Sequence, residues 1–496
     1  MAKVLLVNWD AYPNVTSGGV YSWEKILVES MPDYEFIIFN LLSNPNGNGS
    51  FTVPPQVKDV IDVPIFGSNR YEEFYDEKFR WLLAKVLYTK ECCIKQEFIP
   101  LFERFLEAIF SNDCDPKQLC NLILDLHSFF IIYDYKKCLE HPLAWDAFIE
   151  KLDQDPLYRK MTLTEALTAF QIIQRNLQIL SIQIPKVDLV HCSLAWLPSM
   201  IAVVAKMEQG CPIMITEHGV AFRELLLYYN AILQGEPANI FWKIFSRNVV
   251  RAVYSIADVI APVCYVNAKW EERLGAQSSK IKVIYNGVNS DKFRPIEVSR
   301  TDKRPTVVCV GRVDAFKDIV NLIYSIKHVK DQVPDVHCLI YGGSADLEYS
   351  VHCVNTVKNL GLEDNVKFVG KVKDPELAYN AADVVVMTSI TEGFPFAVIE
   401  AMACGKGIVA TDVGGIREAL EGCGLLVRSS HIEELADAII KLLQDEKLRS
   451  SLGALALKRA RESFTIEQSI GQYRQQYESL IARYHDKTIR KEVAAT

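Results

Sequence analysis

The most informative stretch of the sequence is acidic at both ends. Glu392 and Glu400 flank the run Gly393-Phe394-Pro395-Phe396, which follows an apolar segment typical of a buried strand. A helix is expected to begin near Pro395, leaving the backbone amides from Phe394 to Ala397 free to bind a phosphate. A rise of about 1.5 Å per helical residue separates the two carboxylates by roughly 10 Å. That span suits a ligand with hydroxyl groups at both ends and a diphosphate between them.

A simpler interpretation of the same stretch remains open. Glu392 could cap the helix, and Glu400 could be a solvated helical glutamate.

Two cations stand in the corresponding place after an earlier strand. In the run from Gly311 to Asp318, the glycine permits close backbone approach, and Arg312 and Lys317 follow it. A guanidinium fork and an ammonium group can neutralise a diphosphate and stabilise it as a leaving group. Because ligands bind at the carboxyl ends of parallel strands, we expect both cations to share a crevice with the acidic pair. The alternative is a loop with two unrelated surface cations.

A glycine pair opens the first expected helix of the chain. Ser17-Gly18-Gly19-Val20 follows an apolar strand at residues 3–8. Gly18 and Gly19 suit backbone approach to a phosphate or an acceptor. The third glycine of the dinucleotide fingerprint is missing, so a simple tight turn is an equally good interpretation.

A histidine closes another strand of the first half. His218 follows the apolar run at residues 213–216 and precedes a glycine, a position from which it can face a cleft and hydrogen-bond a sugar hydroxyl. A lone histidine is more often structural. Arg223 and Glu224 come shortly afterwards and are candidates for contact with an acceptor.

The sequence favours no metal site. Two Asp-x-Asp triplets, Asp113-Cys114-Asp115 and Asp153-Gln154-Asp155, each precede a proline and are expected to be surface turns. The cationic pair can neutralise charge in place of a metal. We therefore expect neither a metal nor another cofactor.

The elements that must position these residues alternate between strands and helices. In the second half, short strands separated by helical patterns predict a parallel sheet at 306–311, 337–342, 366–370, 384–388, 408–411 and 425–427. The first half has similar apolar runs at 3–8, 36–39, 60–63, 187–191, 213–216, 257–261 and 281–284. The fold class is therefore α/β with two Rossmann-like domains.

Between the strands of the first half, the residue pattern changes. From about residue 71 to residue 180 glycine is absent and the apolar spacing is helical, as in Phe102, Phe105, Leu106, Ile109 and Phe110. This stretch is too long for a connecting loop, so we expect a helical insertion. We place the first domain at 1–300, the second at 301–464, and a last helix at 465–496 that packs back on the first domain.

Bulk properties exclude several classes of protein. The 496 residues carry a formal net charge of −8, which gives no electrostatic footprint for nucleic acid. The apolar run near the N-terminus is too short for a signal peptide, and no run of about 18 apolar residues predicts a membrane span. We expect a cytoplasmic protein, with peripheral contact at the inner face of a membrane still compatible with the sequence.

Taken together, the motifs resemble those of the family 4 retaining glycosyltransferases, which have the GT-B fold of two Rossmann-like domains facing a cleft. The resemblance rests on Gly311-Arg312 with Lys317 and on Glu392 with Glu400, and it spans most of the chain outside the insertion. The insertion, Asp318 and three short motifs are similar to the PelF-like branch, which builds the Pel exopolysaccharide. These motifs are Gly18-Gly19-Val20-Tyr21-Ser22-Trp23, Thr216-Glu217-His218-Gly219 and Phe222-Arg223-Glu224.

The resemblance implies a role for each candidate residue. Arg312 and Lys317 would hold the diphosphate, Glu400 the ribose, and Glu392 the donor sugar, while His218 would line the sugar site from the first domain. The remaining implied donor contacts are Gly19, Val372, Gly393, Phe394, Pro395 and Phe396. The implied acceptor contacts are Gly18, Arg223 and Glu224.

The resemblance also implies an activity and partners. The chain would move a hexose from a nucleotide-diphosphate sugar, UDP-glucose or a related UDP-sugar, to an exopolysaccharide or glycan acceptor with retention of configuration. A membrane-associated polysaccharide synthesis complex is an implied partner. The alternatives are a catalytically lapsed nucleotide-sugar-binding subunit of such a complex, a sugar-nucleotide epimerase, or a phosphorylase.

Overall fold

The chain folds into two compact α/β units. The computed structural model describes residues 1–14, 18–43, 52–66, 79–232, 235–300, 302–344 and 346–495. The N-terminal unit comprises Met1–Pro262, Ala268–Lys282 and Arg474–Thr496, and the C-terminal unit comprises Val263–Asn267 and Val283–Tyr473. The main crossing between the units therefore lies at residues 282 and 283, earlier than the boundary at 300 that the sequence suggested.

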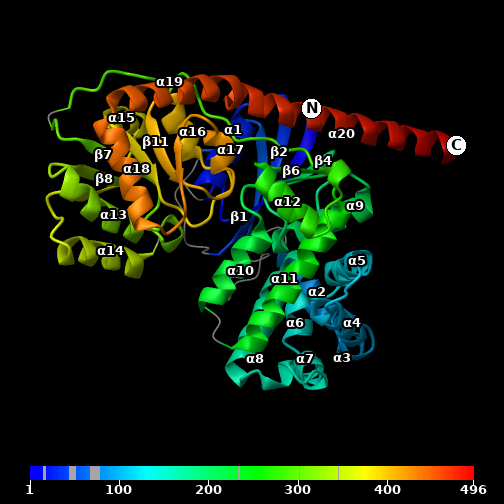
Figure 1. Cartoon of the computed structure of the whole chain (residues 1–496). Helices are drawn as coiled ribbons and strands as arrows, with labels where there is room; N and C mark the ends of the chain where they lie inside the picture. The colour runs from blue at the N-terminus through cyan, green and yellow to red at the C-terminus, as the bar shows by residue number, and fades with distance from the viewer. Residues whose placement is uncertain are drawn as a thin grey trace. The chain divides into compact units, whose positions relative to one another are not determined.

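The N-terminal unit is built on a parallel sheet with strand order β3-β2-β1-β4-β5-β6. Figure 1 labels β1, β2, β4 and β6 of this sheet. The strands are β1 (Ala2–Trp9), β2 (Tyr34–Leu42), β3 (Val57–Pro64), β4 (Leu189–Cys192), β5 (Ile213–Glu217) and β6 (Val259–Pro262). Val4 to Val7 of β1 are fully buried, as expected for a strand covered on both faces.

One expected strand of this unit is wrong. Residues 281–284 form no strand, and Ile281 makes only an isolated bridge to Ile260. The reason is topological, because the chain leaves the N-terminal unit directly after Lys282 and cannot continue along the edge of β6.

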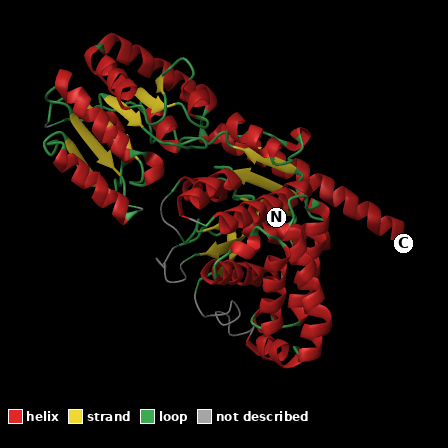
Figure 2. Cartoon of the chain, turned by 60° about the horizontal axis from the view of Figure 1, so that its bottom comes forward, coloured by secondary structure: helices red, strands yellow, loops and turns green. Residues whose placement is uncertain are grey.

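The helices of the N-terminal unit divide into sheet-covering helices and the insertion. The first group comprises α1 (Gly19–Glu29), α9 (Met200–Gln209), α10 (Ala221–Ile232), α11 (Glu236–Ile256) and most of α12 (Tyr265–Arg273). The insertion comprises α2 (Phe79–Tyr88), α3 (Glu91–Cys93), α4 (Ile99–Phe110), α5 (Pro116–Ile132), α6 (Tyr135–Leu139), α7 (Pro142–Gln154) and α8 (Leu163–Leu177). In Figure 2 the described part of the insertion consists of helices joined by loops, without a strand, as the sequence predicted. Its expected start at 71 lies outside the described residues.

The insertion has an aromatic core. Phe102, Phe105, Leu106, Ile109 and Phe110, the residues whose spacing predicted a helix, are all buried on one face of α4. That face packs against α5, α7 and α11, so α11 joins the insertion to the sheet. The triplet 113–115 lies in the turn before α5, as expected, and the side chain of Asp115 caps α5 by accepting a hydrogen bond from the Lys117 amide. The triplet 153–155 was expected to be a turn, but Asp153 and Gln154 form the last residues of α7.

The C-terminal unit confirms all six expected strands. Its parallel sheet has the order β12-β11-β10-β7-β8-β9. The strands are β7 (Thr306–Val310), β8 (His337–Tyr341), β9 (Val366–Gly370), β10 (Val384–Met387), β11 (Gly407–Thr411) and β12 (Leu425–Val427). The helices are α13 (Ile319–Gln332), α14 (Leu347–Asn359), α15 (Pro375–Ala381), α16 (Phe396–Ala403), α17 (Ile416–Leu420), α18 (Ile432–Gln444) and α19 (Glu446–Ser463).

The last helix, α20 (Ile466–Ala495), contacts the N-terminal unit from Arg474 onward. The Arg474 guanidinium lies 2.8 Å from the Asp33 carboxylate, and the Tyr477 hydroxyl lies 2.6 Å from Nδ1 of His191. Among the described residues, no helix has both the length and the apolarity needed to cross a membrane.

Candidate functional site

Lys317 and Glu392 meet at the carboxyl edge of the C-terminal sheet. The Lys317 ammonium group forms an ion pair with the Glu392 carboxylate, although the two residues are 75 positions apart. The Lys317 carbonyl also accepts a hydrogen bond of 2.7 Å from the Thr388 hydroxyl. The loops that follow β7 and β10 are therefore joined through both the backbone and the side chain of Lys317.

Glu392 is a member of this polar group rather than a helix cap. The Ser389 hydroxyl donates a hydrogen bond of 2.6 Å to its carboxylate, and the side chain is only 11% exposed. The interpretation of Glu392 as a cap is thus wrong. An ammonium group has three N–H donors, and Glu392 occupies one of them, so Lys317 can still donate to a ligand oxygen.

Arg312 lies at the opposite end of the same turn. Its Nε is 3.2 Å from Oδ2 of Asp314, whose other oxygen accepts a hydrogen bond of 3.1 Å from the Lys317 amide. The Arg312 side chain is 62% exposed. Both cations are therefore positioned around Asp314, and the guanidinium fork remains accessible to an anion.

The helix start after Glu392 differs in detail from the expectation. Pro395 is the N-cap of α16, and Phe396 is its first helical residue. Helix geometry leaves the amides of Phe396 and Ala397 without intrahelical partners, and proline has no amide hydrogen. The helix-start amides available to a phosphate are therefore those of Phe396 and Ala397.

The Phe394 side chain anchors the loop before α16 in the hydrophobic core. Its side chain is 3% exposed, and its ring lies 4.8 Å from that of Tyr285 and 5.0 Å from that of Phe464. Its carbonyl accepts a hydrogen bond of 2.8 Å from the Asn286 side chain. The Phe394 side chain thus belongs to the core and is not available to contact a ligand.

Glu400 lies within α16 and is held from α15. The Tyr379 hydroxyl donates a hydrogen bond of 2.8 Å to Oε2 of Glu400. Burial raises the pKa of Glu400 to about 7, against the smaller lowering effects of Tyr379 and Lys292. The interpretation of Glu400 as a solvated glutamate is therefore wrong.

Val372, another expected donor contact, lies beyond β9 and packs against the hydrophobic core.

Five residues that shape this edge were not predicted from the sequence, namely Thr388, Ser389, Gly342, Gly414 and Gly415. A Cβ atom on Gly342 would lie 1.7 Å from the Gly311 carbonyl oxygen, whereas one on Gly311 would meet only the Lys317 side chain at 3.9 Å. The steric need for glycine that the sequence suggested at Gly311 thus falls on Gly342. The available signal was a glycine pair after each of two expected strands.

Gly414→Ala is expected to destabilise the C-terminal unit and to displace the Glu392 loop. Gly414 has a φ of 54°, and an added Cβ would lie 1.9 Å from the Glu392 carbonyl oxygen. The left-handed backbone alone costs about 1–2 kcal/mol for a residue with a side chain. The overlap with the Glu392 backbone adds to that cost, so we expect a total of about 3 kcal/mol.

Gly422→Ala is the matched control for Gly414→Ala. Gly422 has a φ of 73°, but a Cβ there meets nothing within 4 Å. Chemical unfolding followed by circular dichroism compares the two variants. Equal destabilisation by both would show that the contact between Gly414 and Glu392 is unimportant.

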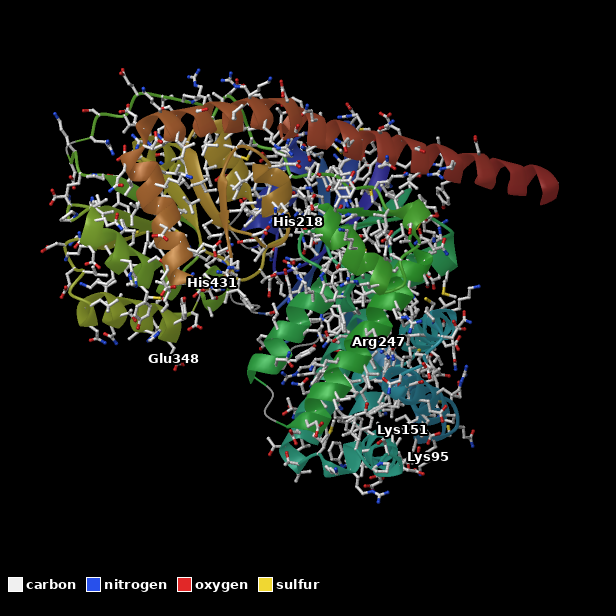
Figure 3. The ribbon with its side chains drawn as sticks, in the orientation of Figure 1. Lys95, Lys151, His218, Arg247, Glu348 and His431 are labelled. Carbon is white, nitrogen blue, oxygen red and sulfur yellow. The ribbon has the colours of Figure 1, made fainter. Side chains whose placement is uncertain are left out.

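In the N-terminal unit, His218 follows β5 and is labelled in Figure 3. Its ring packs against Trp23 of α1 at a centroid distance of 4.6 Å. Burial lowers the pKa of His218 to about 3, so the ring is neutral at pH 7. A neutral imidazole can hydrogen-bond a hydroxyl group but carries no positive charge to the site.

The other first-half candidates lie near the same strand ends. Gly18 is the N-cap of α1 and Gly19 its first residue, while Ser17 lies outside the described residues. The Glu224 side chain folds back on the loop that contains His218. Its carboxylate is so close that a Cβ atom added to Gly219 would lie 1.7 Å from a carboxylate oxygen of Glu224. Arg223 is half-buried beside it, on α10.

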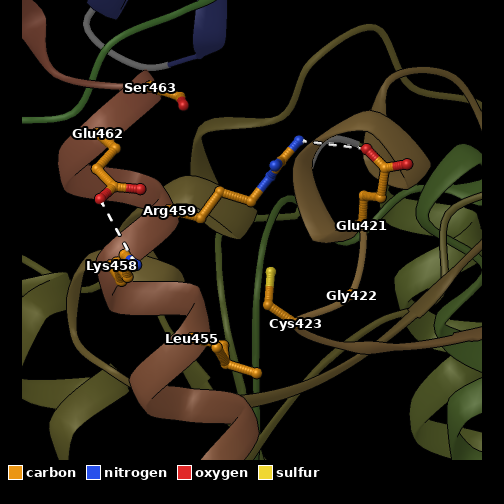
Figure 4. A pocket seen from close by; sticks show the side chains of 8 residues that line it. All are labelled: Glu421, Gly422, Cys423, Leu455, Lys458, Arg459, Glu462 and Ser463. Atoms are coloured by element: carbon orange, nitrogen blue, oxygen red, sulfur yellow. Dashed lines mark ion pairs between the residues drawn. The ribbon is translucent and has the colours of Figure 1, made fainter.

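A separate depression of the C-terminal unit lies between α19 and the turn before β12 (Figure 4). Arg459 pairs with Glu421 at 3.7 Å and Lys458 with Glu462 at 3.9 Å. The charged side chains of this depression are thus paired with one another. None of the expected site residues lines the depression.

Two family models match consecutive parts of the chain. Residues 291–459 match "Glycosyl transferases group 1", and residues 2–279 match "Domain of unknown function (DUF3492)". The chain belongs to the DUF3492 family, and its residues 291–459 match the group 1 glycosyltransferases. The group 1 match contains Arg312, Lys317, Glu392 and Glu400, and the DUF3492 match contains His218.

Curated relatives resemble this chain over part of its length. D-inositol 3-phosphate glycosyltransferase of Kribbella flavida is 26% identical over 316 residues, which cover 60% of this chain and 73% of the relative. N,N'-diacetylbacillosaminyl-diphospho-undecaprenol alpha-1,3-N-acetylgalactosaminyltransferase of Campylobacter jejuni is 31% identical over 251 residues, which cover 46% and 62%. The chain thus spans less than two thirds of the second relative.

Solved structures support the fold. Anabaena Alr3699/HepE in complex with UDP and glucose matches with a TM-score of 0.59 at 17% identity, over 97% of this chain and 100% of that one. Sucrose-phosphate synthase from Thermosynechococcus elongatus matches with a TM-score of 0.60 at 19% identity, over the same shares. The chain therefore has the GT-B fold, with two Rossmann-like units.

Proposed function

We propose that the chain is a retaining hexosyltransferase of the family 4 type. It takes a hexose from a nucleotide-diphosphate sugar, with UDP-glucose or a related UDP-sugar as the first choice, and transfers it to an exopolysaccharide or another glycan. The observation that carries this proposal is the Lys317–Glu392 pair beside the free amides of α16. It combines a cation, a carboxylate and a phosphate-binding helix start at one sheet edge.

The proposed reaction needs stabilisation of a departing diphosphate. The bond between the anomeric carbon and the diphosphate oxygen breaks, and the acceptor hydroxyl oxygen bonds to the same carbon from the same face. The hydroxyl proton passes to the departing phosphate oxygen. Lys317, Arg312 and the amides of Phe396 and Ala397 stabilise the negative charge that develops on that group. Glu392 is placed to accept hydrogen bonds from sugar hydroxyls.

His218 has a binding role in this scheme. Its low pKa keeps the ring neutral, so it positions a sugar hydroxyl and does not act as a general acid. The transferred sugar becomes electron-poor at its anomeric carbon, and a neutral ring avoids opposing that charge.

Nucleotide binding is expected to strengthen as the pH rises through 7. A ribose diol donates hydrogen bonds to the Glu400 carboxylate, whereas a carboxylic acid accepts fewer of them. Because the pKa of Glu400 is raised to about 7, the acid form dominates at pH 6 and the carboxylate at pH 8. We expect the dissociation constant of UDP, measured by calorimetry, to fall about tenfold between these values.

Glu400→Gln is the control for the nucleotide pH dependence. It cannot titrate, so only the titration of the UDP phosphate should remain. An unchanged pH dependence in this variant would contradict the ribose-binding role of Glu400.

The relatives support more than one donor. Alr3699/HepE was crystallised with UDP and glucose, whereas a Mycobacterium tuberculosis relative, 30% identical over 42% of this chain, is named a GDP-mannose-dependent mannosyltransferase. A thermal-shift panel of UDP, GDP and ADP sugars separates these donors. A ligand at 100 times its dissociation constant should stabilise the fold by about 2.7 kcal/mol.

A turnover assay with the best donor completes the test. Release of the nucleoside diphosphate, dependent on an added glycan, supports the transferase. Saturable binding without turnover on any glycan would favour the catalytically lapsed subunit. The PelF-like branch, the membrane-associated complex and independence from a metal remain predictions; the last is tested by full activity in the presence of a chelator.

A further inference from the structure

A buried tyrosine holds the carboxylate to which we assign the ribose. Tyr379 is fully buried in α15, and its hydroxyl lies 2.8 Å from Oε2 of Glu400. Among the described residues this is the only hydrogen bond that the Glu400 side chain accepts. The buried Tyr379 hydroxyl points to Glu400 and not to a ligand.

The Tyr379 ring is fixed independently of its hydroxyl group. The ring belongs to the hydrophobic core of the C-terminal unit, with a centroid distance of 6.2 Å to the Phe293 ring. Removing the hydroxyl oxygen alone therefore leaves the packing of the ring intact. The loss of the hydrogen bond can then be separated from the loss of the aromatic side chain.

The other ionisable groups around Glu400 do not restrain it in the same way. Lys292 and Glu376 act on the Glu400 carboxylate with opposite sign, the first lowering its pKa and the second raising it. They form an ion pair with each other at 3.6 Å, and Cys404 is a neutral thiol because burial raises its pKa to about 12. Tyr379 is thus the neighbour that fixes the orientation of the carboxylate.

We propose that Tyr379 is a positioning residue that orients the Glu400 carboxylate for the two ribose hydroxyls of the nucleotide. The inference rests on the proposed function. The terminal torsion of a glutamate is broad, so an unrestrained carboxylate rotates with little resistance. One hydrogen bond to Oε2 fixes this rotation, and the remaining lone pairs of both oxygens then face a fixed direction. The Tyr379 hydroxyl also stabilises the charged form that accepts hydrogen bonds from a diol.

The experiment measures nucleotide binding with and without the ribose hydroxyls. The probes are UDP, GDP and ADP, each with the counterpart that lacks both hydroxyls, and the protein is the full chain at pH 8. Tyr379→Phe is expected to weaken the tightest of the three about tenfold, the size of a lost hydrogen bond to a charged group. Binding of the corresponding dideoxy nucleotide is expected to stay unchanged.

Two further variants complete the design. Tyr324→Phe makes the same chemical change on a 40% exposed tyrosine of α13 and should bind all probes like the wild type. In the double variant Tyr379→Phe with Glu400→Gln, the effect of the tyrosine should largely disappear, because the carboxylate that it orients is gone.

The outcomes separate this inference from the proposed function. An equal loss for the ribose and dideoxy probes, or no loss at all, would overturn the role of Tyr379 even if Glu400→Gln weakens binding. If Glu400→Gln binds like the wild type, or if the wild type binds none of the three nucleotides, the site itself is wrong and the inference is overturned with it.

Discussion

Lys317→Ala is expected to lower sugar transfer by about 10³-fold, the upper part of the range for the loss of one preorganised donor. Two effects combine. The variant loses the ammonium group that stabilises the departing diphosphate, and it leaves the Glu392 carboxylate, which is only 11% exposed, without its cation. An unpaired carboxylate beside the phosphate site repels the donor as well as the developing charge. The assay compares kcat and KM for the donor identified by the ligand panel.

Arg428→Ala is the matched control for Lys317→Ala. Arg428 is an exposed cation of the same unit, paired with Glu434 at 2.8 Å, and it has no part in the proposed site. It should retain full activity. Lys317→Arg keeps the charge but changes the donor geometry and should recover only part of the rate. Wild-type activity in a folded Lys317→Ala protein would remove the main support for the proposed chemistry.

Glu24→Gln is expected to abolish a large part of the pH dependence of stability in the N-terminal unit. Glu24 is fully buried in α1 and accepts hydrogen bonds of 2.9 Å from the Asn8 side chain and the Tyr12 amide. Burial dominates over these bonds and raises the pKa of Glu24 from 4.5 to about 8. The folded state thus keeps a proton that the unfolded state releases between these two values.

The sign of the effect follows from that difference. Below pH 4.5 both states bind the proton, so burial of the acid has no pH-dependent cost. As the pH rises toward 8 the unfolded state loses its proton first, and the wild type loses roughly 4 kcal/mol of stability between pH 5 and pH 8 from this group. Glutamine does not titrate, so Glu24→Gln should lack this loss.

The measurement has a convenient probe. All seven tryptophans, at positions 9, 23, 81, 145, 196, 242 and 270, belong to the N-terminal unit, so their fluorescence during urea unfolding follows that unit. Glu29→Gln changes an exposed glutamate of α1, and its free energy of unfolding should depend on pH as in the wild type. If the free energy of unfolding changed with pH equally in Glu24→Gln and in the wild type, Glu24 would be shown to stay ionised in the folded state.

Much of the C-terminal unit could be predicted because its strands are short, apolar and separated by helical patterns. All six strands were located within one residue at either end, and the residues after β7 and β10 were correctly singled out. The prediction failed at 281–284, where an apolar pattern suits a strand but the chain leaves the unit. Local pattern cannot reveal such a crossing.

The sequence by itself determined the alternation of strands and helices, the helical insertion, and which cations and carboxylates stand at strand ends. These features depend on local periodicity and on neighbours in the chain. Only the tertiary structure decided that Lys317 pairs with Glu392, that Tyr379 holds Glu400, and that Gly342 rather than Gly311 makes the close approach. Each of these contacts joins segments that follow different strands, and strand order in a sheet is set by packing of the whole unit, not by any one segment.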